Sequence, residues 1–390
     1  MVGMFLHFLL VLLGVLSILV SIQAQDQSGF ISIDCGLPEH LNFSSTTTTI
    51  NYISDANFIN TGVSKRIELI GNNADIPQQL EYVRSFPDGV KNCYKIDVTN
   101  GTKYLIRASF YYGNYDDLNE PPQFDLYFGA NLWDTINASL YRPTEIIYTP
   151  SQDYIQPCLV NTGNGTPFIS TIELRPLNNE TYVTDSAKSA LSRFTRLDIG
   201  SITNLQYRYK DDVYDRLWKP FQSNGKKNLS TNNNDLFIQN IYEPPVIVMN
   251  TAVTPVNESA PLQYYWDADD VTDEYYLYLY FNEVEELTAS DTRAFNITVN
   301  DEFWYGPVIP KYGVAFTVFS RGPLTKAATY TVTLSKTEDS TLPPILNAFE
   351  LYKMFEGGSS AIKFSWSVCI FVILLVLVMW KGSTAVMDDY

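Results

Sequence analysis

Few residues of this chain could perform chemistry that needs an imidazole group. The 390 residues include only two histidines, His7 and His40, and His7 lies in an apolar leader. A zinc site built on several histidines is therefore excluded, and a Ser/His/Asp triad could be assembled only around His40.

Acidic side chains could hold a calcium ion. The densest acidic cluster comprises Asp267, Asp269, Asp270, Asp273 and Glu274. An EF-hand loop needs Gly at its sixth position and Glu at its twelfth, where this chain has Thr272 and Tyr278. A solvated turn before a strand is the favoured interpretation, and we predict no metal site.

Paired carboxylates could also cleave a glycosidic bond, and Asp116, Asp117 and Glu120 would supply them. Every acidic loop contains such pairs, however, and cleavage requires a separation of roughly 5 to 9 Å that sequence spacing does not establish. We therefore predict no catalytic residue, no enzyme activity and no cofactor.

A tyrosine-rich loop favours ligand binding. Tyr111, Tyr112, Tyr115 and Asp116 lie in one short stretch, and sugars are held by aromatic faces with carboxylate hydrogen bonds beside them. The stretch follows a strand-like segment at 104–110 and would project from the end of a β-sandwich. The alternative is that these tyrosines pack between loops. If they bind sugar, replacing Tyr111 and Tyr112 by Ala should abolish binding and leave the melting temperature nearly unchanged.

The overall charge excludes one class of partner. Lys and Arg together number 26 and Asp and Glu 43, so the formal net charge is −17. A chain this negative repels phosphate backbones, and we predict no nucleic-acid partner.

Both ends of the chain carry apolar segments. Residues 1–24 contain no Asp, Glu, Lys or Arg and precede a polar stretch, so they are predicted to be a secretory signal peptide, with an uncleaved anchor as the alternative. Residues 364–380 contain no charge and lie between Lys363 and Lys381. As a helix of about 25 Å they would be at the short limit for a hydrocarbon core of ~30 Å.

A transmembrane helix at 364–380 is the favoured interpretation of that segment. A buried core helix and a lipid-anchor signal are the alternatives. The predicted order is a linker at 354–363, the helix, and a cytoplasmic tail at 381–390. The chain is then a single-pass plasma-membrane protein with an extracellular N-terminus.

The potential glycosylation sites and the cysteines agree with the predicted export of the chain. Eight Asn-x-Ser/Thr sequons occur, at Asn42, Asn100, Asn137, Asn164, Asn179, Asn228, Asn257 and Asn296. Three cysteines precede the apolar run, at Cys35, Cys93 and Cys158. In an oxidising compartment two of them should pair, with the connectivity left open, and the third should be free, buried or paired with another chain.

An internal repeat indicates two copies of one domain. Four aromatic residues recur at an offset of 171: Tyr104 and Tyr275, Phe110 and Phe281, Phe124 and Phe295, Trp133 and Trp304. The stretch 167–174 has an echo 177 residues later at 344–351, and Asp-Cys-Gly at 34–36 has a weaker one at 198–200. This period suits tandem globular units, which we place at 25–193 and 194–353.

Each copy has the pattern of an all-β fold. Alternation directs one set of side chains to a core, namely Phe124, Leu126 and Phe128 with their counterparts Phe295, Ile297 and Val299. Tyr276, Tyr278 and Tyr280 face the other side of their strand, where packing under a neighbouring segment is favoured over ligand contact. Turn signals suit two antiparallel β-sandwiches, and 186–192 could be a short helix between them.

Several sequence stretches are more specific than these patterns. They are Ile-Asp-Cys-Gly at 33–36, Asp-Asp-Val-Tyr-Asp-Arg-Leu-Trp at 211–218, and the stretches 86–94, 112–116, 124–133, 158–163 and 342–348. Together they resemble the malectin-like ectodomain of plant leucine-rich-repeat receptor-like kinases, over residues 30–353. The resemblance implies two malectin-like β-sandwiches at the cell surface, in a fold related to a carbohydrate-binding protein.

The sequence also departs from that family. No leucine-rich repeat and no kinase motif follows residue 353, so we do not expect kinase activity. Three hypotheses remain: a receptor module that binds a cell-wall oligosaccharide or a peptide and signals through a receptor-kinase co-receptor, a truncated receptor product that acts as a decoy, and an adhesive surface glycoprotein without a small ligand.

Overall fold

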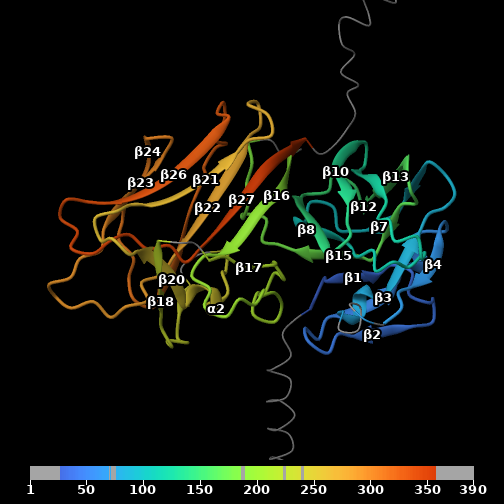
Figure 1. Ribbon diagram of the computed structural model, residues 1–390, viewed down its shortest axis with the longest axis horizontal. Helices are drawn as coiled ribbons and strands as arrows, with labels where there is room; N and C mark the ends of the chain where they lie inside the picture. The colour runs from blue at the N-terminus through green and yellow to red at the C-terminus, as the bar shows by residue number, and fades with distance from the viewer. Residues whose placement is uncertain are drawn as a thin grey trace, which may run out of the picture. The chain divides into compact units, whose positions relative to one another are not determined.

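The computed structural model describes residues 27–69, 71, 76–185, 189–222, 225–238 and 241–356 (Figure 1). The predicted signal peptide, transmembrane helix and tail lie outside these residues, as does most of the predicted linker. Within the described ranges, no helix is both long enough and apolar enough to traverse a bilayer.

The described part of the chain is almost entirely β-structure, as the sequence predicts. Its first strands are β1 (Ile31–Asp34), β2 (Asn42–Ser44), β3 (Asn51–Ser54), β4 (Val63–Arg66), β5 (Tyr82–Ser85), β6 (Lys91–Cys93), β7 (Ile96–Asp97), β8 (Tyr104–Phe110), β9 (Gln123–Phe128), β10 (Asn131–Asn137), β11 (Arg142–Tyr148), β12 (Tyr154–Ile155), β13 (Pro157–Asn164), β14 (Phe168–Ile169) and β15 (Thr171–Pro176).

The strands that follow are β16 (Ser189–Asp198), β17 (Lys219–Pro220), β18 (Lys226–Ser230), β19 (Phe237–Ile238), β20 (Thr251–Pro255), β21 (Leu262–Asp267), β22 (Tyr275–Phe281), β23 (Phe295–Val299), β24 (Glu302–Val308), β25 (Val314–Phe319), β26 (Thr329–Lys336) and β27 (Ala348–Glu356). Helical structure in the described residues is limited to the four-residue α2 (Val246–Met249) and short 3-10 turns such as Asp55–Asn57 and Gln78–Leu80.

One large sheet runs through both halves of the described chain. Its order is β19-β25-β22-β27-β16-β11-β8-β15-β1-β3-β2, with β17 paired to β16. Two four-stranded sheets accompany it, β10-β9-β13-β6 and β21-β26-β23-β24. Figure 1 shows β16 and β27 side by side near the middle of the drawing, where the two halves of the chain meet.

Two separate hydrophobic clusters lie against the large sheet. The first combines side chains of β1, β8 and β15 with side chains of β9 and β13, for example Ile106 and Leu126. The second combines β22 and β27 with β23 and β26, for example Leu277 and Ile297. Each cluster therefore receives side chains from the large sheet and from one of the four-stranded sheets.

Two pairs of corresponding strands in the sequence repeat have matching lengths. The strands β8 and β22 both have seven residues and are buried throughout, and β10 and β24 also have seven residues each. Trp133 and Trp304 are each the third residue of their strand. Five of the six predicted core residues of β9 and β23 are buried, whereas Val299 is only half-buried at the end of its strand.

The predicted helix at 186–192 is wrong for its last four residues, which begin β16. Leu191 and Ser192 pair with Ile147 and Ile146 of β11, and the same strand pairs with β27 over its whole length. These two neighbours supply backbone hydrogen bonds that override a weak local helix preference. The predicted domain boundary between residues 193 and 194 consequently falls inside one continuous strand.

Candidate functional site

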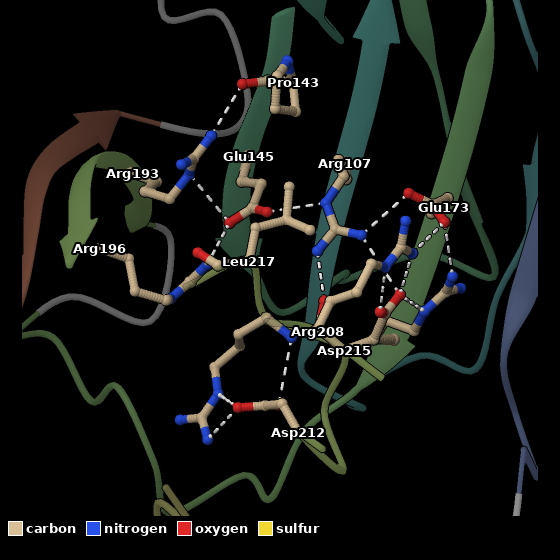
Figure 2. A network of polar contacts seen from close by, with 12 residues as sticks. Arg107, Pro143, Glu145, Glu173, Arg193, Arg196, Arg208, Asp212, Asp215 and Leu217 are labelled. Carbon is tan, nitrogen blue, oxygen red and sulfur yellow. Dashed lines mark hydrogen bonds and ion pairs between the residues drawn. The ribbon is translucent and has the colours of Figure 1, made fainter. Parts of the chain in front are cut away.

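A network of buried ion pairs lies where β8, β11, β15, β16 and β27 meet the segment 207–218 (Figure 2). Asp215 is at its centre. Its Oδ2 accepts from Arg175 Nε at 2.8 Å and from Arg208 Nη2 at 2.7 Å, and Arg107 Nη1 is 3.3 Å away. Its Oδ1 accepts from Arg208 Nε at 2.8 Å. One carboxylate therefore holds three arginines.

Two strand glutamates extend the network along the large sheet. Arg107 Nε donates to Glu145 at 2.7 Å and its Nη1 donates to Glu173 at 2.9 Å. Glu145 also accepts from Arg196 Nη1 at 2.8 Å, and Arg196 Nε donates to Glu350 of β27. Charged groups of both halves of the chain are thus joined through Arg196.

A second carboxylate shapes the segment that carries Asp215. Asp212 Oδ2 accepts from Arg216 Nε at 2.9 Å and from Trp218 Nε1 at 2.7 Å. Arg216 also donates to the hydroxyl of Tyr182 at 3.0 Å. These bonds explain the Asp-Asp-Val-Tyr-Asp-Arg-Leu-Trp motif at 211–218: its polar residues fix the segment against the sheet.

The charge state of the network follows from its pairing. Burial opposes ionisation of the carboxyls, but the nearby guanidinium groups outweigh it and lower the pKa of Glu173 to about 2 and the pKa of Asp215 further. The pKa values of Glu145 and Glu350 are lowered for the same reason. A buried network of this kind joins the segment 207–218 to the strands of the large sheet.

Sequence patterns gave a partial signal for this network. Arg107, Glu173 and Glu350 each stand directly between two apolar residues of a strand, and Glu173 and Glu350 occupy corresponding positions of the repeat. A charge in a buried strand requires a partner. The partners Asp212 and Asp215 lie on an irregular segment, so spacing along the chain does not reveal the pairing.

The predicted sugar-binding loop packs into the first hydrophobic cluster. Tyr112 and Tyr115 are 4% and 9% exposed, and each has its ring within about 6 Å of the Phe168 ring. The Tyr112 hydroxyl donates to the Asp116 carboxylate. Tyr111 is half-buried at the edge of the cluster. The loop geometry therefore favours the packing interpretation.

A glycine makes this close packing possible. Gly113 has a φ of +52°, and a Cβ at this position would lie 2.6 Å from Ile67 Cδ1. Only glycine avoids both the strain and the clash. The turn that follows it folds the Tyr115 ring back onto the core.

The tyrosines of β22 also pack into a hydrophobic cluster. Tyr276, Tyr278 and Tyr280 are almost fully buried in a third cluster, on the face opposite the second core. The Tyr280 hydroxyl donates to Glu350 at 2.8 Å. Packing was the favoured interpretation for these residues, and their burial agrees with it.

The acidic cluster at 267–274 is a hydrogen-bonded turn. Asp270 accepts from the backbone and the hydroxyl of Thr272, and these bonds lower the Asp270 pKa. Lys353 Nζ lies 3.1 Å from Asp269 and 2.8 Å from Asp273. In the part of the chain that the structure describes, no group of three or more acidic, His or Cys side chains is arranged to hold a metal ion.

Two of the three cysteines form a disulfide, as expected. Cys93 of β6 and Cys158 of β13 face each other in antiparallel register and are bonded, while Cys35 is free and buried. The choice of pair depends on strand register, which the sequence does not give.

The eight sequons differ in their surroundings. Asn179 Nδ2 donates to the carbonyl of Gly101 at 2.9 Å, and Asn228 Nδ2 donates to the carbonyl of Ser201 at 3.1 Å. Asn296 is half-buried against Gly306. Every sequon asparagine except Asn296 is exposed, namely Asn42, Asn100, Asn137, Asn164, Asn179, Asn228 and Asn257.

Two cavities lie in the second half of the chain. An apolar one of about 210 Å³ is lined by residues such as Phe194, Trp266 and Leu351. A polar one of about 250 Å³ is bordered by the end of β16 and includes Asp198 and Asn250. Sequence patterns do not indicate either cavity, because the walls of both come from segments far apart in the chain.

Comparison with known proteins agrees with the predicted resemblance. Residues 33–354 match the family model of the malectin-like domain. The LRR receptor-like serine/threonine-protein kinase IOS1 of Arabidopsis thaliana is 44% identical over 355 residues, which is 89% of this chain and 39% of the relative. The chain thus spans about two fifths of the length of the curated relatives it matches, in their ectodomain region.

Solved structures share the fold at low sequence identity. The ANX2 ectodomain from Arabidopsis thaliana superposes with a TM-score of 0.69 at 18% identity, covering 84% of this chain and 97% of that one. A structure of the plant peptide RALF23 in complex with FER and LLG2 gives a TM-score of 0.65 at 19% identity, covering 84% and 95%. From the family match and these relatives, we conclude that the chain belongs to the malectin-like domain family of plant receptor-like kinase ectodomains.

Proposed function

We propose that this chain acts at the cell surface as a ligand-binding receptor module and that its ligand is a peptide held together with a partner protein. The observation that carries the proposal is the family match over residues 33–354. Relatives 44% identical over nearly the whole chain are receptor-like kinases. The network around Asp215 supports a rigid, non-catalytic scaffold.

Two observations favour a peptide over a sugar. A structural neighbour was solved with the peptide RALF23 and the protein LLG2. In addition, a sugar at the predicted loop would rely mainly on Tyr111 and Asp116, because Tyr112 and Tyr115 are committed to the core. A cell-wall oligosaccharide remains the second ligand class that we propose.

The proposed topology follows the sequence. Residues 1–24 are removed on export, the ectodomain of two tandem malectin-like units over 25–193 and 194–353 faces outward and carries glycans, and 364–380 crosses the membrane. The predicted partner is a receptor kinase that supplies the signalling step.

Binding to the full chain tests this function. The chain, immobilised in detergent, is exposed to a panel of synthetic secreted plant peptides and in parallel to a plant glycan array, with an unrelated glycosylated surface protein as the control. We expect saturable binding of a peptide that the control does not share. Binding to glycans alone would replace the peptide by the second ligand class, and no binding to either would contradict the proposal.

A further inference from the structure

The polar cavity beside β16 has the features of a built site. Its volume is about 250 Å³, below the usual size of a pocket for a drug-sized molecule and suited to the end of one side chain. Most of its lining residues carry a hydroxyl, amide or carboxyl group. Those that matter for ligand binding are Asp198, Ser201, Ile202, Ile247, Asn250 and Thr251.

One buried oxygen atom of the cavity lacks a partner. Asn250 Oδ1 has no hydrogen-bond partner, although the residue is more than nine-tenths buried. The Asp198 carboxyl is 1% exposed and is neighboured by the hydroxyls of Ser201 and Thr251, the latter at a long 3.5 Å. Unmade hydrogen bonds at buried polar atoms are costly, so a group that donates to these oxygens would be held.

The lining is also one-sided in charge. Among the lining residues that the structure describes, Asp198 is the one with a formal charge, and none is Lys or Arg. The groups that face Asp198 are the hydroxyls of Ser201 and Thr251 and, across the cavity, Tyr207. Burial without a cationic partner raises the pKa of Asp198 to about 7.

We propose that this cavity binds the cationic end of a basic peptide side chain, with Asp198, Ser201 and Asn250 as the oxygens that receive its N–H groups. A guanidinium or ammonium group brings only donors, which matches the unpaired acceptor of Asn250 and the carboxylate of Asp198. A neutral sugar would leave the carboxyl without a counter-charge, and an anion would be repelled by it.

Two further features support a cationic ligand. The exposed side chains of Ile202 and Ile247 border the cavity and can pack on the methylene stem of a basic residue. The net charge of −17 attracts basic peptides to the whole chain. The inference rests on the proposed peptide-binding function and names one contact within it.

Saturation-transfer NMR of the full chain tests the contact with two probes. Arginine amide acetylated at its α-amine carries the guanidinium as its only charge, and citrulline amide acetylated in the same way has a similar shape and no charge. We expect binding of arginine amide only, about tenfold tighter at pH 8 than at pH 6, because the ionised fraction of Asp198 rises as the pH passes 7. Equal binding of both probes would overturn the inference in favour of a neutral ligand, and so would binding of neither.

Three variants test whether arginine amide binds in this cavity. Asp198→Asn should abolish arginine amide binding, and Ile202→Lys should do the same by placing a cation at the exposed border of the cavity. Asp153→Asn removes an exposed carboxylate that does not line the cavity and should bind as the parent does. Unchanged binding in Asp198→Asn and Ile202→Lys would place the probe elsewhere and overturn the inference.

The outcomes separate this inference from the proposed function. If the Asp198→Asn variant still binds a peptide normally, the proposed function is supported and the proposed contact at Asp198 is contradicted. If the chain binds arginine amide as expected but binds no peptide from the panel, cation binding in the cavity is supported and the proposed function is contradicted.

Discussion

Tyr112 shows how one side chain can be mistaken for a ligand contact. Its position after a strand and beside Asp116 suits sugar binding, but its ring is packed against Phe168 and its hydroxyl is satisfied within the loop. Sequence alone gives the residue types and not the direction of the side chains, because Gly113 turns the chain back onto the core.

The packing of Tyr112 predicts a large loss of stability on truncation. Tyr112→Ala should lower the free energy of unfolding by about 3 kcal/mol, because it opens a cavity in a buried aromatic cluster. Tyr111→Ala, at a half-buried position, should cost about 1 kcal/mol. Urea unfolding of both variants measures the difference. This result would reverse the expectation of an unchanged melting temperature, and equal, small losses would restore Tyr112 as a candidate ligand contact.

The segment 207–218 is held in place by ion pairs of its buried Asp215. Asp215→Asn keeps the shape of the side chain but leaves Arg107, Arg175 and Arg208 short of a counter-charge. We expect a loss of about 3 to 5 kcal/mol in the free energy of unfolding.

Asp211→Asn is the matched control for that substitution. Asp211 is exposed and next to the buried Asp212 in the same motif, so its replacement should change the urea midpoint little. If Asp215→Asn and Asp211→Asn unfold at the same urea concentration, the network does not hold the segment.

The disulfide ties β6 to β13 at one end of their paired region. It closes a loop of 65 residues, and its loss should cost about 4 kcal/mol in the chain-entropy description. Thermal unfolding of the Cys93→Ser/Cys158→Ser variant measures this cost, with Cys35→Ser as the comparison for a buried thiol outside the bridge. A double variant that melts with the parent would show that strand pairing alone fixes β6.

The strands were the most predictable elements, and the connections were the least. Alternation placed Phe124, Leu126 and Ile297 in cores, and the offset of 171 residues predicted two copies of one domain, in which β8 and β22 both have seven residues. By contrast, β16 and the polar cavity depend on pairings between distant segments. Local preference does not encode such pairings, so the sequence placed a helix where β11 and β27 impose a strand.

At the scale of the whole molecule, two groups of buried carboxyls give opposite pH dependences. The network carboxyls have lowered pKa values, so the stability they contribute is present above about pH 4 and is lost as the pH falls through their folded-state values. Asp198 has a raised pKa, near 7, so its contribution is fully present below about pH 4 and is lost as the pH rises to 7. Asp34, its counterpart in the sequence repeat, is shifted in the same direction.

Because the two groups of carboxyls have opposite pH dependences, the free energy of unfolding should be greatest on the acidic side of neutrality, near pH 4 to 5. A rise of about three pKa units at Asp198 corresponds to roughly 4 kcal/mol between pH 4 and pH 7. The melting temperature of the full chain, measured from pH 3 to pH 8, should therefore fall by several degrees on each side of the maximum.

Asp198→Asn separates the two contributions, because an amide cannot ionise. This variant should keep the decline below pH 4, which belongs to the network, and lose much of the decline between pH 4 and pH 7. Asp153→Asn should follow the parent at every pH. Parallel curves for the parent and Asp198→Asn would mean that the Asp198 carboxyl ionises with little cost in the folded chain, and that the buried network alone sets the pH dependence.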